Sequence, residues 1–149
     1  MVDKIRILDK VPREKLPEIY RRYDGLIFSS IWEEAFALTP LEAMASGVPV
    51  ISTTTGGNRE IIEDGEVGLE YEAENSQYLA SRMETLMTDT RLWRHLRSKG
   101  KEVVSRRFTV PHMVDAVEKY LEETLRITEK KHEYSGIAER TLVRNAAGY

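Results

Sequence analysis

Short apolar runs alternate with amphipathic stretches along the first half of the chain, and this alternation predicts strands and helices in turn. The expected strands are KIRIL at 4–8, GLIF at 25–28, VPVIST at 48–53 and LEYE at 69–72. The expected helices span 11–23, 39–46 and, for a short one, 59–62. Strands that alternate with helices favour βαβ units. We therefore expect an α/β fold with a Rossmann-like parallel sheet of about four strands and flanking helices.

The second half of the chain has apolar residues at helical spacing from Asn75 onward. Helices are expected at 76–87, 89–108 and 109–127. The last of these is expected to bury Met113, Val117, Tyr120 and Leu121. Beyond it the periodicity is weak. The pattern therefore predicts one domain over residues 1–125 with a helical C-terminal part, followed by a helical or flexible tail over 126–149.

The helix expected at 39–46 has boundary signals at both ends. Thr39 suits the N-cap, Pro40 the first helical position and Gly47 the position just past the end. Thr39 and Glu42 also have the spacing of a capping box, in which the glutamate accepts a hydrogen bond from the Thr39 backbone N–H. From spacing alone, this structural role is the favoured interpretation of Glu42.

The loop before this helix has features of an anion site. The backbone N–H groups of Phe36, Ala37 and Leu38 can point out of the loop, where the helix dipole adds about half a positive charge. That combination suits a phosphate or diphosphate. Glu34 and Glu42 would flank the anion and accept hydrogen bonds from sugar hydroxyls, which is the layout of a nucleotide sugar. From spacing alone, an ordinary solvated loop acid is the favoured interpretation of Glu34.

The stretch SSIWEEAFALTPLEAMASGVPVISTTTGGNREIIEDGEVGL resembles the signature of the retaining nucleotide-sugar glycosyltransferases, the family of glycogen synthase, sucrose synthase and bacterial mannosyltransferases. Members have two Rossmann-like domains, an arrangement named GT-B. Their hallmark is a glutamate, seven residues and a second glutamate, which Glu34 and Glu42 reproduce, with Phe36 in the aromatic place. The resemblance runs from about Ile7 to about Leu125 and implies an incomplete GT-B C-terminal domain.

The resemblance implies a role for each matched residue around the donor. Glu34 would be the catalytic residue that contacts the transferred sugar and stabilises an oxocarbenium-like transition state. The backbone of Phe36, Ala37 and Leu38 would hold the diphosphate. Glu42 would accept hydrogen bonds from the ribose hydroxyls.

Two further segments match the family less distinctively. Val11 and Pro12 resemble the loop beside the nucleobase. Gly56 and Gly57 match a tight turn near the site, where a purely conformational role is an equally good interpretation.

The chain also departs from the family pattern. Ala37 replaces the usual glycine. The arginine and lysine that grip the diphosphate in the family have no counterpart in the sequence, and neither has the N-terminal acceptor domain. The resemblance therefore implies the donor-binding portion of an enzyme. We expect it to be inactive or nearly so without an N-terminal domain or a partner chain.

Composition narrows the possible partners. The chain is 41% hydrophobic and 32% charged, which is typical of a folded globular protein, and its net charge of -3 offers no attraction for nucleic acid. Three histidines lie far apart and no acidic triplet is evident, so neither a metal nor another cofactor is expected. Absence of cysteine, of a signal peptide and of any apolar run of roughly 20 residues favours the cytoplasm.

One charged segment has two interpretations, one of which is contact with a membrane. Residues 91–107 hold seven basic residues and one acid. A solvated helix face is the favoured interpretation, and an approach to anionic lipid is the alternative.

Two other functions remain open at this point. The first is a non-catalytic nucleotide-binding or assembly module that forms a homo-oligomer through an unpaired strand edge of an incomplete sheet. The second is a sugar-nucleotide epimerase of the same two-domain architecture. The glutamate spacing follows the transferase pattern more closely.

Overall fold

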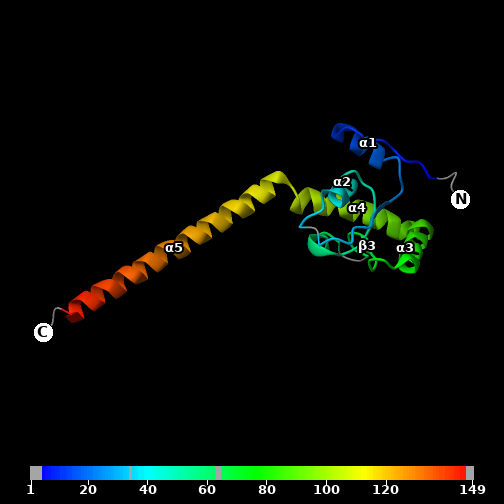
Figure 1. Cartoon of the computed structure of the whole chain (residues 1–149). Helices are drawn as coiled ribbons and strands as arrows, with labels where there is room; N and C mark the ends of the chain where they lie inside the picture. Colours follow the sequence, from blue (N-terminus) through cyan, green and yellow to red (C-terminus); the bar gives the residue numbers. More distant parts are fainter. Residues whose placement is uncertain (1–4, 34, 63–64, 147–149) are drawn as a thin grey trace. The chain divides into compact units, whose positions relative to one another are not determined.

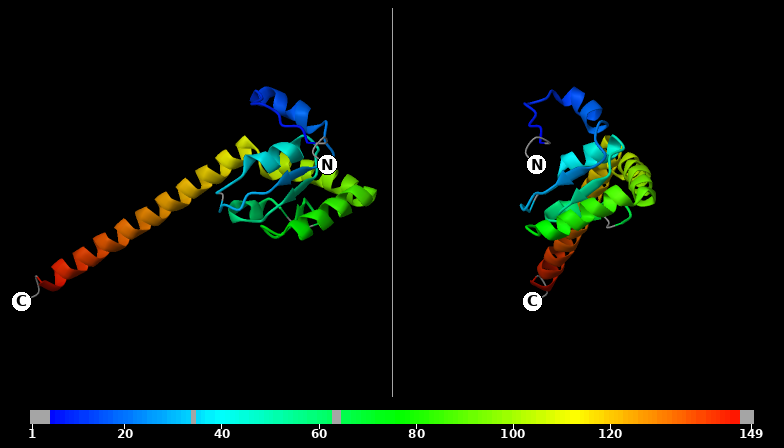
Figure 2. Two further views of the ribbon diagram at one scale, coloured as in Figure 1. Left: turned by 45° about the vertical axis from the view of Figure 1, so that its right-hand side comes forward. Right: turned by 90° about the vertical axis from the view of Figure 1, so that its right-hand side faces the viewer.

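Three short parallel strands form a sheet in the order β1-β2-β3 (Figures 1 and 2). The strands are β1 (Leu26–Phe28), β2 (Val50–Ser52) and β3 (Leu69–Glu70). Leu26 lies opposite Val50, and Ile51 lies opposite Leu69. The computed structural model describes residues 5–33, 35–62 and 65–146, with side chains as far as residue 128. Within these residues the predicted parallel α/β sheet is confirmed, with three strands in place of about four.

The predicted strand at 4–8 is wrong for its described residues, 5–8, which form no regular structure. Ile5 is 75% exposed and Ile7 is 91% exposed. A strand forms only where a neighbour satisfies its main-chain hydrogen bonds, and β1 pairs only with β2 among the described residues. Alternation in the sequence gives the segment strand character but does not supply a partner.

Helices connect and cover the strands. Their bounds are η2 (Arg13–Lys15), α1 (Leu16–Tyr20), α2 (Leu38–Ala45), η3 (Gly56–Glu60), α3 (Ser76–Thr88) and α4 (Thr90–Arg107). The helix predicted at 11–23 is shorter because Pro17 requires a place in a first helical turn, and α1 begins at Leu16. The short helix predicted at 59–62 begins instead at Gly56 and has 3-10 geometry.

Alternate residues of β2 point into two different cores. Val50 belongs to a cluster with Leu41, Met44 and Val104, while Ile51 packs with Leu86 and others. This alternation places α2 on one side of the sheet and α3 on the other, as Figure 2 shows, while α4 contributes Val104 to the first cluster and Leu96 to the second. β2 is buried throughout. β1 is less buried, since Ile27 on the sheet edge is 40% exposed.

Helices α2 and α4 approach closely where α4 has a glycine. A Cβ atom on Gly100 would lie 3.2 Å from the Met44 Cγ atom and 3.5 Å from the Val67 carbonyl oxygen. The absence of a side chain at this position therefore allows α4 to pack against α2.

The second unit of the chain, Thr109–Tyr149, contains α5 (Val110–Ala146) and is distinct from the first, Met1–Phe108. The predicted domain boundary at 125 falls inside it. Met113, Val117, Tyr120 and Leu121 are 51–73% exposed, so the prediction that they are buried is wrong. No other element of this unit covers them in the described part of the chain. Among the described residues, no helix has the length and apolar character needed to cross a membrane.

Candidate functional site

The N-terminus of α2 lies two residues earlier than the predicted N-cap and first helical position. Ala37, with φ -85° and ψ 120°, is the N-cap, and the helix begins at Leu38. The predicted N-cap, Thr39, is therefore wrong. Pro40 becomes the third helical residue, which it tolerates because the N–H groups of a first turn have no intrahelical partner in any case. The amides of Leu38 and Thr39 are left without such partners, as an anion site requires.

The carboxylate of Glu42 is not part of a capping box. No side chain caps α2 among the described residues, and Glu42 is the fifth residue of the helix. Its Oε1 atom accepts a hydrogen bond of 3.0 Å from the Arg13 guanidinium. Its Oε2 atom lies 3.5 Å from the Tyr20 hydroxyl, which donates to it. The favoured interpretation from spacing is thus wrong, because Glu42 faces away from the helix start and toward α1.

Glu42 contributes to a cavity of about 280 Å³ between α1 and α2. The cavity is lined by Arg13, Leu16, Pro17, Tyr20, Arg21, Glu42, Ala45 and Ser46. Burial raises the pKa of Tyr20, and the negative charge of Glu42 and the hydrogen bond to it raise this pKa further. The Glu42 side chain is 30% exposed and remains open to a ligand.

The segment predicted to lie beside the nucleobase leads directly to this cavity. Val11 is half-buried and Pro12 is exposed. The Pro12 carbonyl accepts a hydrogen bond of 3.0 Å from the Lys15 amide, which starts η2 and positions Arg13. Of this segment it is Arg13, the residue after Pro12, that contacts Glu42 across 29 residues, and neither Val11 nor Pro12 lines the cavity.

The loop between β1 and α2 is anchored by aromatic packing. The Phe36 ring lies 5.7 Å from the Phe108 ring, centroid to centroid, with the planes tilted by 45°. Ala37 is 4% exposed, and Leu38 is 54% exposed. Leu38 and Glu42 are four residues apart and share one face of α2. Glu34 lies outside the described residues, so its predicted position opposite Glu42 stays a prediction.

A second loop, after β2, is tied to the loop after β1. The Thr53 hydroxyl donates a hydrogen bond of 2.5 Å to the Ser30 carbonyl, and the Thr55 hydroxyl donates one of 3.2 Å to the same oxygen. Gly56 follows with φ +56°, in the left-handed region that favours glycine. Gly57 continues η3 without a positive φ. The backbone thus gives Gly56 a conformational role.

Three residues near these loops are absent from the sequence-based predictions. Arg13 and Tyr20 contact Glu42 from 29 and 22 residues away, and no local spacing signals such a contact. Asn58 is fully buried in η3, and neither polar atom of its side chain has a hydrogen-bond partner in the structure. In the described residues, no group of three or more His, Cys, Asp or Glu side chains is arranged to hold a metal ion.

A family model described as Glycosyl transferases group 1 matches residues 1–103. Spore coat protein SA of Bacillus subtilis is 34% identical over 89 residues, which cover 59% of this chain and 24% of that protein. The lipopolysaccharide core biosynthesis mannosyltransferase LpsB of Rhizobium meliloti is 31% identical over 123 residues, 81% of this chain and 35% of that protein. The chain thus spans about a quarter to a third of the length of these curated relatives.

Two solved structures resemble the chain. The C-terminal domain of a group 1 glycosyl transferase (LpcC) from Francisella tularensis has a TM-score of 0.63 and 33% identity, and the match covers 70% of this chain and 53% of that one. Anabaena HepE in complex with UDP has a TM-score of 0.69 and 28% identity, with 74% of this chain and 30% of that one covered. Both similarities agree with the observed α/β fold.

Proposed function

Because the chain belongs to the Glycosyl transferases group 1 family, we propose that it forms the donor-binding portion of a retaining glycosyltransferase. In this proposal a sugar is transferred from a nucleoside diphosphate sugar to an acceptor hydroxyl. The acceptor is held by an N-terminal domain or a partner chain, and the present chain alone turns over slowly or not at all. The UDP complex of the similar Anabaena protein supports a nucleoside diphosphate as the ligand.

The observation that carries this proposal is the orientation of Glu42. A glutamate that closed a capping box would turn its carboxylate back to the start of its own helix. Here the carboxylate lies in a cavity beside the second half of α2, with one oxygen held by Arg13 and the other at 3.5 Å from Tyr20. An ionised carboxylate has about four acceptor positions, so hydroxyls of a ribose can bind beside these two donors.

In this proposal the other parts of the donor contact residues besides Glu42. The amides of Leu38 and its neighbours Phe36 and Ala37 hold the diphosphate with support from the helix dipole. This arrangement places partial positive charge at the anion without a divalent ion. Glu34 contacts the transferred sugar, and Val11 and Pro12 border the nucleobase.

Isothermal titration of the chain with UDP tests the donor site. Glu42→Gln keeps the shape of the side chain but removes its charge, and we expect affinity to fall about tenfold to a hundredfold, the range for a hydrogen bond to a charged group. Glu84→Gln, on the exposed surface of α3, is the matched control and should leave affinity unchanged. Unchanged UDP affinity in Glu42→Gln, or an equal loss in Glu84→Gln, contradicts the assignment.

Among the described residues no strand pairs with the outer edge of β1, and this edge favours a second candidate, an assembly module. Leu26 and Phe28 bond to the β2 segment through the Leu26 amide and the Phe28 carbonyl, at 2.9 Å and 3.2 Å. The main-chain groups of Ile27 therefore face away from β2, and a further strand can pair with them. Analytical ultracentrifugation distinguishes the two candidates, since a monomer that binds UDP counts against a homo-oligomeric module.

A further inference from the structure

A basic groove lies at the C-terminal end of α2. Three cations of α4, Arg94, Arg97 and Lys101, line it together with Arg21, around a cavity of about 530 Å³. None of these four side chains has an ion-pair partner within the part of the chain that the structure describes. On the same helix Arg106 is, by contrast, paired with Glu102. The groove thus concentrates positive charge that the protein itself does not neutralise.

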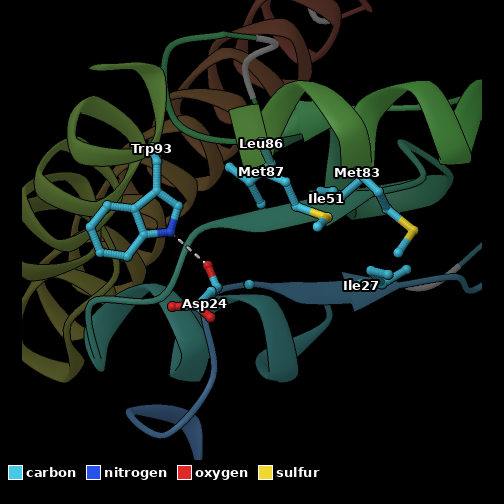
Figure 3. A pocket seen from close by; sticks show the side chains of 8 residues that line it. Asp24, Ile27, Ile51, Met83, Leu86, Met87 and Trp93 are labelled. Atoms are coloured by element: carbon cyan, nitrogen blue, oxygen red, sulfur yellow. Dashed lines mark hydrogen bonds between the residues drawn. The ribbon is translucent and has the colours of Figure 1, made fainter. Parts of the chain in front are cut away.

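An apolar groove adjoins the basic one, and Trp93 lines both. Figure 3 shows it between β1 and α3, with Ile27, Ile51, Met83, Leu86 and Met87 around it. Met87 is 81% exposed and Met83 is 38% exposed. Large apolar side chains with this exposure, next to unpaired cations, form an amphipathic surface.

Trp93 is held firmly at the junction of the two grooves. Its indole N–H donates a hydrogen bond of 2.8 Å to the Asp24 main-chain carbonyl, the dashed line in Figure 3. The Arg97 guanidinium lies 5.1 Å from its ring centroid. Asp24 is the acidic residue that lines the apolar groove, against four cations in the basic groove. The junction therefore presents an oriented tryptophan between positive and apolar surfaces.

The basic groove borders the Glu42 cavity, with which it shares Arg21, Ala45 and Ser46, but it lies apart from the loop that precedes α2. Ala45, Ser46 and Gly47, at the C-terminal end of α2, line the basic groove, whereas the donor loop precedes Leu38 at the other end. An eight-residue helix separates its ends by roughly 12 Å. A diphosphate bound at the start of α2 therefore does not occupy the basic groove.

We propose that this surface, defined by Arg21, Arg94, Arg97, Lys101, Trp93, Met83 and Met87 and termed the Trp93 surface, docks on a membrane that contains anionic phospholipids. The cations bind lipid phosphates. Trp93 lies at the level of the headgroups, where amphipathic aromatic rings are favoured. Met87 and Met83 enter the boundary of the acyl chains. The net charge of -3 opposes a general attraction to anions, so the contact is confined to this surface.

Co-sedimentation with vesicles tests the proposal. The whole chain should bind vesicles of three-quarters phosphatidylcholine and one-quarter phosphatidylglycerol, and should not bind pure phosphatidylcholine. Each Lys or Arg near an anionic surface changes the partition coefficient about fivefold, so Arg94→Gln with Lys101→Gln should lower it about 25-fold. Arg91→Gln with Arg106→Gln removes the same charge from α4 outside the groove and should lower it about twofold at most.

Two further measurements separate the membrane from other occupants. Trp93 emission, recorded in a Trp32→Phe background, should shift to the blue with anionic vesicles, and Met87→Ser should weaken binding.

Equal losses in the two double variants, or no dependence on phosphatidylglycerol, overturn the proposal. If inorganic phosphate displaces the protein from the vesicles and chloride of equal ionic strength does not, the basic groove binds a small anion, and this result also overturns the proposal. Concentration-dependent dimerisation that Met87→Ser abolishes assigns the apolar groove to a second copy. UDP affinity of these variants reports on the donor site separately.

Discussion

Helices α4 and α5 have the same apolar spacing but different surroundings. In α4, Leu96 and Val104 are 1% and 9% exposed, with Gly100 between them against Met44. In α5, residues at the same interval of four, Met113, Val117 and Leu121, are 59%, 51% and 60% exposed. The comparison shows that periodicity predicts which face of a helix is apolar, whereas burial depends on what packs against that face.

The largest effect that tests this comparison is expected from the same substitution made in each helix. Leu96→Ala removes a buried side chain and should lower the free energy of unfolding by about 2–5 kcal/mol. Leu121→Ala removes an exposed one and should change it by about 0.5 kcal/mol or less. Urea unfolding followed by tryptophan fluorescence gives both values. A loss at Leu121 as large as that at Leu96 would mean that a partner covers the apolar face of α5.

The elements that the sequence predicts well are those with local signals. Helix α4 begins after Asp89, whose side chain caps it, and α3 follows the apolar spacing of Leu79 and Leu86. The parallel sheet follows from apolar runs separated by helices. The strand at 4–8 fails because its pairing depends on a neighbour, which no pattern within the segment reveals.

In the candidate site, too, local sequence patterns fail to predict contacts between residues that lie far apart in the sequence. The spacing of Thr39 and Glu42 suggests a capping box, but the helix starts at Leu38, and the carboxylate turns to Arg13 and Tyr20. Those partners come from a segment brought close only by the fold. The orphaned amide of Asn58 is likewise invisible in the sequence, because its burial depends on the surrounding core.

Overpacking is the second test. Gly100→Leu introduces a side chain where Met44 and the Val67 carbonyl leave no room, and should cost about 1–3 kcal/mol of stability. Ala116→Leu adds a similar volume to the exposed surface of α5 and should be close to neutral. Thermal unfolding by circular dichroism compares the two. A neutral Gly100→Leu would show that α2 can move away from α4 without loss of packing.

The N-terminal caps of α4 and α5 are expected to differ by less in their contribution to stability. The Asp89 carboxylate accepts hydrogen bonds of 2.9 Å from the amides of both Arg91 and Leu92. The Thr109 hydroxyl accepts a longer one, 3.3 Å, from the amide of His112. We expect Asp89→Ala to cost about 1 kcal/mol in urea unfolding, and Thr109→Ala clearly less. Equal costs would contradict the difference in geometry.

The smallest expected effect concerns Tyr20, a polar residue of the first unit whose pKa depends on its burial. Because burial and then Glu42 raise the folded-state pKa of Tyr20 above its ordinary 10.0, folding favours the neutral phenol. This stabilisation is complete below pH 10 and is lost as the pH rises through the folded-state pKa. Absorbance titration, with Tyr20→Phe subtracted, measures that pKa. Glu42→Gln should lower it only in part, since burial remains, and an unchanged value would place Tyr20 out of contact with Glu42.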